Sequence, residues 1–249
     1  MINLQHFTLS KKQLDSIPEN ERTLIFLLCH VASELAVLTK LFRICSADVE
    51  VKQKYFKEAR DAQWLTIGRL LMGKIYEFWK LLEKSFFATK ISKDYAPHFD
   101  QDTNAALDNL KKYFGSNNFI KTVHHNFAFH YSADQIKVGY GKLDKDDSLD
   151  AYLSITNVNS LYSFAESVVF RSMMESISPN DHAKAITSLL DETSKVIKWI
   201  NEFIGGCVAT CLTLHVGGDL GAKENKIEDA EDWKTITIPY FVEIEENDS

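Results

Sequence analysis

The sequence contains few residues that interrupt helices. Proline occurs 4 times and glycine 10 times in 249 residues, and these two residues supply many sharp turns and end many helices. A fold of many short strands needs many turns, so this shortage argues against a β-rich fold. Hydrophobic residues make up 45% of the chain, enough to bury a substantial core. The composition predicts an all-α protein.

The chain also lacks an excess of basic residues and a secretion signal. Its formal net charge is −7, which argues against a surface that binds nucleic acid everywhere but is compatible with one local basic groove. The N-terminal stretch MINLQHFTLSKKQLDS has no continuous apolar segment behind a basic start. We therefore expect a cytoplasmic protein whose four cysteines are reduced thiols.

No apolar run is both long and uninterrupted enough to predict a membrane span. TLIFLLCHVASELAVLTKL is interrupted by His30 and Glu34, and FIGGCVATCLTLHVGG is too short to cross a bilayer comfortably. We expect both to be buried core helices in which Cys29, Cys207 and Cys211 act as small apolar side chains. The sequence therefore predicts no membrane contact.

Familiar catalytic and metal-binding patterns are missing as well. Cys207, Cys211 and His215 share one helix face, but the first and last lie about 12 Å apart along the axis, too far to bind one ion. No histidine has a glutamate three residues before it, as di-metal helical bundles require, so His30 and Glu34 are expected to be a polar pair. No glycine cluster fits a dinucleotide or phosphate loop, and no serine lies in a nucleophile elbow. We expect no cofactor and no metal site.

Apolar residues recur at helical spacing through most of the chain. Ser16, Pro18 and the acidic residues after them mark a helix start, and we expect the two longest helices at about 19–45 and 50–88, running antiparallel. Further helices are expected at about 103–114, 119–131, 159–177 and from Ser178, with Pro179 in the first position, to about 216. Residues 134–150 are expected to be a surface excursion.

The C-terminal region has a different pattern. WKTITIPYFVEI alternates β-forming residues around Pro239, which predicts a short strand or an extended arm, and the final acidic residues are expected to be disordered. We expect residues 225–249 to form an extended or partly disordered tail, with TITIPYFVEI as the only place of extended backbone. The rest is expected to fold as one domain, residues 1–249, in a bundle of five to seven helices.

Three of the eight histidines lie in FIKTVHHNFAFHY, residues 119–131. On an α-helical wheel Asn126 and His130 share one face, whereas His130 lies about 120° from His124 and about 140° from His125. One α-helix is therefore not expected to aim the three imidazoles at a single phosphate group.

Basic and aromatic side chains accompany the histidines in the sequence. Lys111, Lys112 and Lys121 give this region a local positive excess in an acidic protein. This excess predicts a phosphate-facing surface.

The segment HHNFAFHY resembles the motif of HEPN domains, all-α proteins of prokaryotic defence systems and toxin–antitoxin pairs. That motif has an arginine, usually a polar residue after it, and a histidine four to six residues further on. His130 takes the place of the motif histidine and Asn126 that of the polar residue. Histidine replaces the arginine: His125 in the tighter register and His124 in the looser one.

The resemblance implies metal-independent RNA cleavage at a composite site formed by two subunits. It therefore implies a homodimer, an RNA substrate, and an antitoxin or a defence-system protein as partner. The residues expected to contact this RNA are Lys111, Lys112, Lys121 and Tyr131. His130 and either His125 or His124 would share the general-base and general-acid roles, with a lysine as phosphate clamp.

Two other interpretations of the motif stay open. Arginine offers a planar bidentate fork whereas histidine offers at most two donors, so the chain is equally expected to be a non-catalytic HEPN-like binding or partner protein. In the third interpretation, the imidazoles are ordinary polar positions of an unrelated helical bundle.

Overall fold

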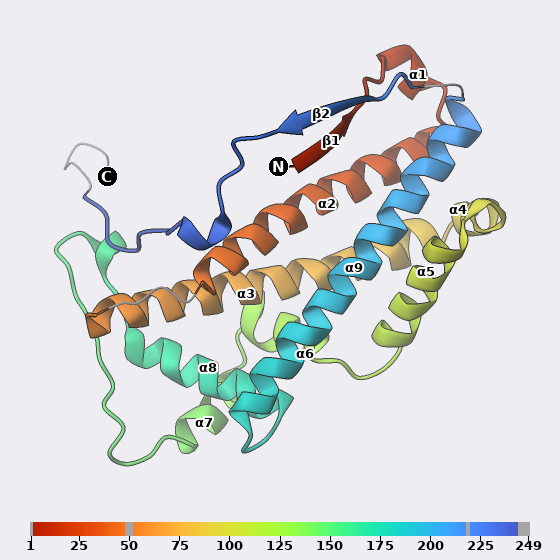
Figure 1. Ribbon diagram of the computed structural model, residues 1–249. Coiled ribbons are helices and arrows are strands. Elements are labelled where there is room, and N and C mark those ends of the chain that lie inside the picture. The colour runs from red at the N-terminus through yellow and green to blue at the C-terminus, as the bar shows by residue number, and fades with distance from the viewer. Residues whose placement is uncertain (1, 48–51, 218–219, 244–249) are drawn as a thin grey trace. The chain divides into compact units, whose positions relative to one another are not determined.

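The computed structural model describes residues 2–47, 52–217 and 220–243. Within these ranges the chain is mainly α-helical, with one small two-stranded sheet (Figure 1). The predicted all-α class is confirmed. The predicted disorder of the last acidic residues concerns residues 244–249, which lie outside the described ranges.

The described residues form nine α-helices rather than five to seven. The helices are α1 (Lys11–Asp15), α2 (Glu19–Cys45), α3 (Lys54–Leu82), α4 (Ile91–Tyr95), α5 (Gln101–Phe114), α6 (Phe119–Val123), α7 (Ala133–Gly141), α8 (Ser163–Ile177) and α9 (His182–His215). Single π-helical turns follow α3 (Glu83–Phe87) and α6 (His124–Ala128), and 3₁₀ turns lie at Ala96–His98, Asn157–Asn159 and Trp233–Thr235. The unexpected helices α1 and α4 have five residues each, too few to show a helical period in the sequence.

The chain divides into two compact units. Unit 1 comprises residues 1–36, 74–118 and 193–232, and unit 2 comprises residues 37–73, 119–192 and 233–249. The helices α2, α3 and α9 each contribute residues to both units. The expectation of a single domain stays a prediction.

Aromatic side chains fill the core of unit 1. Phe203 of α9 is fully buried, and its ring centroid lies 6.4 Å from that of Phe78, 5.3 Å from that of Phe86 and 6.0 Å from that of Phe99. Rings at these separations pack edge to face, which adds to the roughly 1.5–3 kcal/mol gained by burying each side chain. This cluster holds α9 against the end of α3 and the turn before α5.

The C-terminal end of α9 makes a polar contact with the start of α2 in unit 1. His215 Nε2 lies 2.7 Å from Glu21 Oε2, and the Tyr95 hydroxyl donates to the same oxygen at 2.8 Å. Cys207 and Cys211 are fully buried, as predicted, and burial raises the pKa of both thiols. Their role as small apolar core residues is confirmed.

Helix α2 is less buried than predicted. Cys29 is exposed, and so are Phe26 and Leu27, because the apolar residues of α2 surround the helix while its buried stripe is narrow. By length and composition alone α2 is long and apolar enough to cross a membrane, and 22% of its most apolar window is buried. The cytoplasmic location and the lack of membrane contact stay predictions.

The one sheet among the described residues lies where no strand was expected. Strand β1 (Ile2–His6) pairs antiparallel with β2 (Lys223–Ile227) in unit 1, with Ile2 opposite Ile227 (Figure 1). The expectation that only the tail would be extended is therefore wrong. All residues of both strands are exposed. The sequence of β1 does alternate apolar Ile2 and Leu4 with polar residues, whereas β2, KENKI, shows no apolar alternation.

In unit 2 the end of α2 runs antiparallel to α3, as predicted. Phe42 packs beside Gly68, where a Cβ would lie 2.9 Å from the ring, and Trp64 Nε1 donates to Ser46 Oγ at 3.0 Å. Phe42 contacts Gly68, whereas the later Ser46 contacts the earlier Trp64, so the two segments run in opposite directions. The longest helix, however, is α9, with 34 residues against 29 in α3 and 27 in α2.

The surface excursion predicted at 134–150 is partly a helix. Helix α7 packs on α8 through Gly139, where a Cβ would lie 2.7 Å from the Ser172 nitrogen and 2.8 Å from the Val168 oxygen. Only glycine permits this approach, so tertiary packing stabilises a helix despite a sequence typical of a loop.

Helix α9 also starts later than predicted. Ser178 caps the end of α8 by donating its N–H to Met174 O, and Asn180 follows with φ +62°. Asp181 then accepts the Lys184 N–H at 3.0 Å and begins α9. Pro179 therefore lies in the turn between the helices and not in the first position of α9.

Residues 236–242 of the tail pack on α3 without forming a strand. Gln63 Nε2 donates to Ile238 O at 3.3 Å, and the Tyr240 hydroxyl donates to Ser160 O at 2.9 Å. Tyr240 and Phe241 cover a small core made of Ala59, Ala62 and Leu161. Side-chain burial, rather than ladder pairing, holds this segment.

Candidate functional site

The histidine-rich segment is not a regular α-helix. After α6, residues His124–Ala128 form a π-helical turn, which closes with the Phe129 N–H donating to His124 O at 3.3 Å. The chain then bends, and the Ser132 N–H donates to Asn126 O at 3.2 Å. Because a π turn spaces its hydrogen bonds by five residues rather than four, the angles of an α-helical wheel do not apply.

The three imidazoles converge within one chain. The ring centroid of His124 lies 4.8 Å from that of His125 and 5.7 Å from that of His130, and the centroids of His125 and His130 are 6.1 Å apart. One ring nitrogen from each side chain can be chosen so that all three atoms lie within 4.8 Å of one another. The predicted separation of the imidazoles assumed a regular α-helix and is therefore wrong for this segment, where one chain brings the three side chains together.

The burial of the three histidines differs in a way that suits a binding site. His124 is 5% exposed, while His125 and His130 are exposed. The His124 ring packs edge to face against the rings of His125 and His130. The buried imidazole thus forms the floor of the cluster, and the two exposed imidazoles can be reached by a ligand from solvent.

Helix α3 supports the cluster through Gly73. A Cβ at this position would lie 3.0 Å from Phe129 Cδ2, closer still to Cε2, and 3.2 Å from Ala128 Cβ. The Phe129 ring packs edge to face on His124, with centroids 5.3 Å apart, and Phe127 is 2% exposed. Gly73 therefore lets the π turn lie close to α3, and buried Phe127 anchors it.

The other predicted site residues are only partly gathered. Asn126 is half-buried, and its backbone carbonyl fixes the bend before α7. Tyr131 is 85% exposed beside His130. Lys121 is exposed on α6. Lys111 and Lys112 lie on α5 in unit 1, so their place relative to the histidines stays a prediction.

The cluster offers two kinds of chemistry. Imidazole exchanges protons near neutral pH and can act as general acid or general base. Neutral imidazole is also a common metal ligand, and these three residues could hold one ion. Sequence reasoning missed the ligand set because no sequence signal revealed the π turn that brings the nitrogens together.

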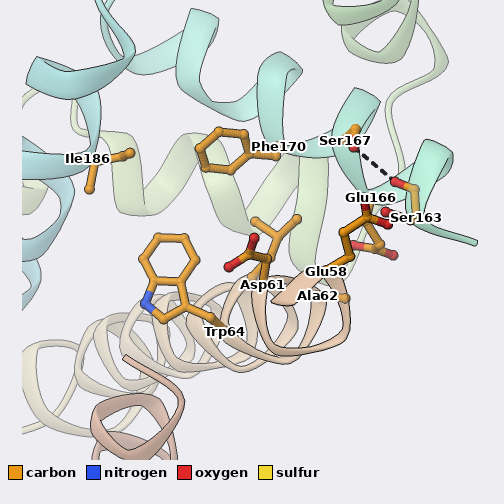
Figure 2. A pocket seen from close by; sticks show the side chains of 10 residues that line it. Glu58, Asp61, Ala62, Trp64, Ser163, Glu166, Ser167, Phe170 and Ile186 are labelled. Atoms are coloured by element: carbon orange, nitrogen blue, oxygen red, sulfur yellow. Dashed lines mark hydrogen bonds between the residues drawn. The ribbon is translucent and has the colours of Figure 1, made fainter. Parts of the chain in front are cut away.

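Unit 2 also contains a cavity of about 340 Å³ between α3, α8 and the start of α9, shown in Figure 2. Its acidic lining residues are Glu58, Asp61 and Glu166. Burial raises the pKa of Asp61, and Glu166 pairs with Arg69 at 3.4 Å. Its residues come from segments about 100 residues apart and form no motif, so no sequence pattern predicts this cavity.

Comparison with known proteins adds no assignment to this geometry. No family model matches the chain, and neither a curated protein nor a solved structure matches it. The resemblance to HEPN domains therefore rests on Asn126, His130 and the residues around them.

Proposed function

We propose that the chain is a metal-independent endoribonuclease with a modified HEPN-like motif. The observation that carries the proposal is the convergence of three imidazole nitrogens within 4.8 Å, with His125 and His130 open to solvent. A nuclease of this kind needs two proton-transfer groups beside one phosphodiester, and imidazole is suited to both roles.

The reaction uses the RNA's own 2′-hydroxyl as nucleophile. One imidazole, from His125 or His130, removes the proton of the 2′-hydroxyl, and that oxygen attacks the adjacent phosphorus in line. The P–O5′ bond breaks, and the second imidazole, as imidazolium, protonates the leaving 5′-oxygen. The products are a 2′,3′-cyclic phosphate and a free 5′-hydroxyl.

The arginine of the HEPN motif would stabilise the charge that develops on the phosphate oxygens. Here that role falls to the imidazolium that donates the proton, to His124 behind it, and to Lys121. A preorganised hydrogen-bond donor is most effective where protein excludes water around the phosphate, and His124 is buried.

A homodimer remains part of the proposal, with an antitoxin or a defence-system protein as the partner class. One chain gathers the three imidazoles, so proton transfer does not itself require a second subunit. The dimer would instead place two clusters along one RNA. Light scattering that shows a strict monomer at micromolar concentration would remove the dimer from the proposal.

Cleavage of single-stranded RNA in EDTA by the purified chain tests the proposal. We expect a 2′,3′-cyclic phosphate product, and His130→Ala should lower the rate by roughly 100-fold to 10,000-fold. His98→Ala is the matched control, because His98 is exposed and is not one of the three clustered histidines. Activity that persists unchanged in His130→Ala would mark a contaminant and refute the assignment.

A non-catalytic RNA-binding protein is the second candidate. The observation that favours it is the exposed aromatic surface beside the imidazoles, where Tyr131 is 85% and Phe129 41% exposed. Such rings stack on unpaired bases. Binding of single-stranded RNA without cleavage, weakened in Tyr131→Ala, would support this candidate over the nuclease.

A further inference from the structure

We propose that His124, His125 and His130 together bind one divalent transition-metal ion of the Zn²⁺ class. Three atoms that are no more than 4.8 Å apart lie within about 2.8 Å of a common point, whereas Zn–N bonds measure about 2.0–2.1 Å. If the nitrogen of buried His124 stays in place, those of His125 and His130 each have to move by no more than about 1.2 Å to reach this bond length. Side-chain rotations of the two exposed histidines can provide this movement.

The donor set determines the class of metal. Imidazole nitrogen suits Zn²⁺, Cu²⁺, Ni²⁺ and Fe²⁺, while Mg²⁺ and Ca²⁺ prefer carboxylate, carbonyl and water oxygen. All three donors here are imidazole nitrogens. Three protein ligands also leave a fourth tetrahedral position open to water or another small ligand.

The fold holds this site together in two ways. His124 is buried and its ring packs against Phe129, so its position is fixed before an ion arrives. His125 and His130 are exposed, so an ion can enter from solvent and they can close on it. Ordering two short side chains costs far less than assembling three ligands from separate segments.

Metal binding would regulate the proposed nuclease, a consequence that rests on the proposed function, whereas the metal site itself does not. A nitrogen lone pair that ligates an ion cannot accept the proton of a 2′-hydroxyl, and a ligating nitrogen carries no proton to donate. Zn²⁺ and phosphodiester cleavage therefore compete for the same atoms, and the ion-bound state is inactive.

Isothermal titration of the EDTA-dialysed full chain with Zn²⁺ tests the site directly. Because the exposed thiol of Cys29 is another zinc ligand, the titrations use the wild type and Cys29→Ser side by side. We expect one Zn²⁺ per chain in both and no binding of Mg²⁺ at the same concentrations. Co²⁺ should give visible absorption bands typical of four-coordinate nitrogen ligation.

Substitutions of the exposed ligands locate the site. Loss of a second-shell contact to a metal ligand weakens metal binding about 10-fold to 100-fold, so losing a ligand in His125→Gln or His130→Gln should weaken it by at least about 100-fold. His98→Gln should bind as the wild type does. Circular dichroism checks that the variants keep the fold. Zn²⁺ binding that is absent in the wild type, or unchanged in the His125→Gln/His130→Gln double variant, overturns the inference.

The same variants separate this inference from the proposed function. If the chain binds Zn²⁺ through the histidines but cleaves no RNA in EDTA, the metal site stands and the nuclease proposal fails. If it cleaves RNA in EDTA but binds no Zn²⁺, the nuclease stands and the metal site fails. If both hold, cleavage should fall by half at the Zn²⁺ concentration that half-fills the site.

Discussion

Two adjacent glycines of α9, Gly205 and Gly206, should respond in opposite ways to the same substitution. A Cβ at Gly206 would meet the Oγ1, Cγ2 and Cβ of Thr103 on α5, all closer than 3 Å and the last at 2.7 Å. Nothing lies within 4 Å of a Cβ at Gly205. Thr103 is 3% exposed, so its side chain has little room to move.

The magnitudes follow from two effects. Replacing glycine by alanine inside a helix stabilises it by about 1 kcal/mol, and this gain applies to both positions. Overpacking a well-packed contact costs about 1–3 kcal/mol, and this cost applies to Gly206 alone. Gly205→Ala should therefore raise the free energy of unfolding by up to about 1 kcal/mol. The free energy of unfolding of Gly206→Ala should be about 1–3 kcal/mol lower than that of Gly205→Ala.

Urea denaturation followed by circular dichroism measures the difference. For a chain of this size 1 kcal/mol corresponds to about 2–4 °C in melting temperature, so thermal unfolding offers a second measure. Thr103→Ala removes the two nearest atoms and should recover part of the loss when combined with Gly206→Ala. Equal stability of Gly205→Ala and Gly206→Ala would refute the close packing of α9 on α5.

Three further predictions concern unit 2 and the thiols. The hydrogen bond from His182 lowers the pKa of the Glu175 carboxyl. The stability that ionised Glu175 contributes is therefore present above the unfolded pKa of about 4.3 and is lost as the pH falls through the folded pKa. Glu175→Gln should reduce the loss of stability at acid pH, measured by urea denaturation at several pH values. Ser132 caps α7, and Ser132→Ala should cost about 1 kcal/mol in urea denaturation. Cys207 is buried with a raised pKa, so a thiol reagent monitored by mass spectrometry should modify exposed Cys29 first.

The long helices could be predicted because several signals agree there. The predicted helix at 19–45 matches α2 at both ends, where Pro18 and acidic residues mark the start and the buried Leu24, Leu28 and Leu35 give a helical period. Helix α3 ends earlier than predicted, at Leu82, because a π turn continues the helical path to Phe87. A helical period does not distinguish a π turn from the last turns of an α-helix.

Short elements and the geometry of the site could not be predicted, because tertiary contacts decide them. Helix α7 depends on the contact of Gly139 with α8, and the π turn depends on the space that Gly73 leaves on α3. Both glycines have a low intrinsic helix propensity, so local sequence alone argues against a helix or a helical contact at these positions. An α-helical wheel therefore misplaced the three histidines relative to one another, and their role in a site stays a prediction.

The π turn makes the histidine cluster sensitive to chain length as well as to side-chain chemistry. Deleting one residue between His124 and Phe129 would let the segment continue as a regular α-helix, and every side chain after the deletion would rotate by about 100° about the axis. His130 would then leave the cluster although no histidine had been replaced. Substituting a residue between the histidines should therefore disturb the positions of the three imidazoles less than deleting one.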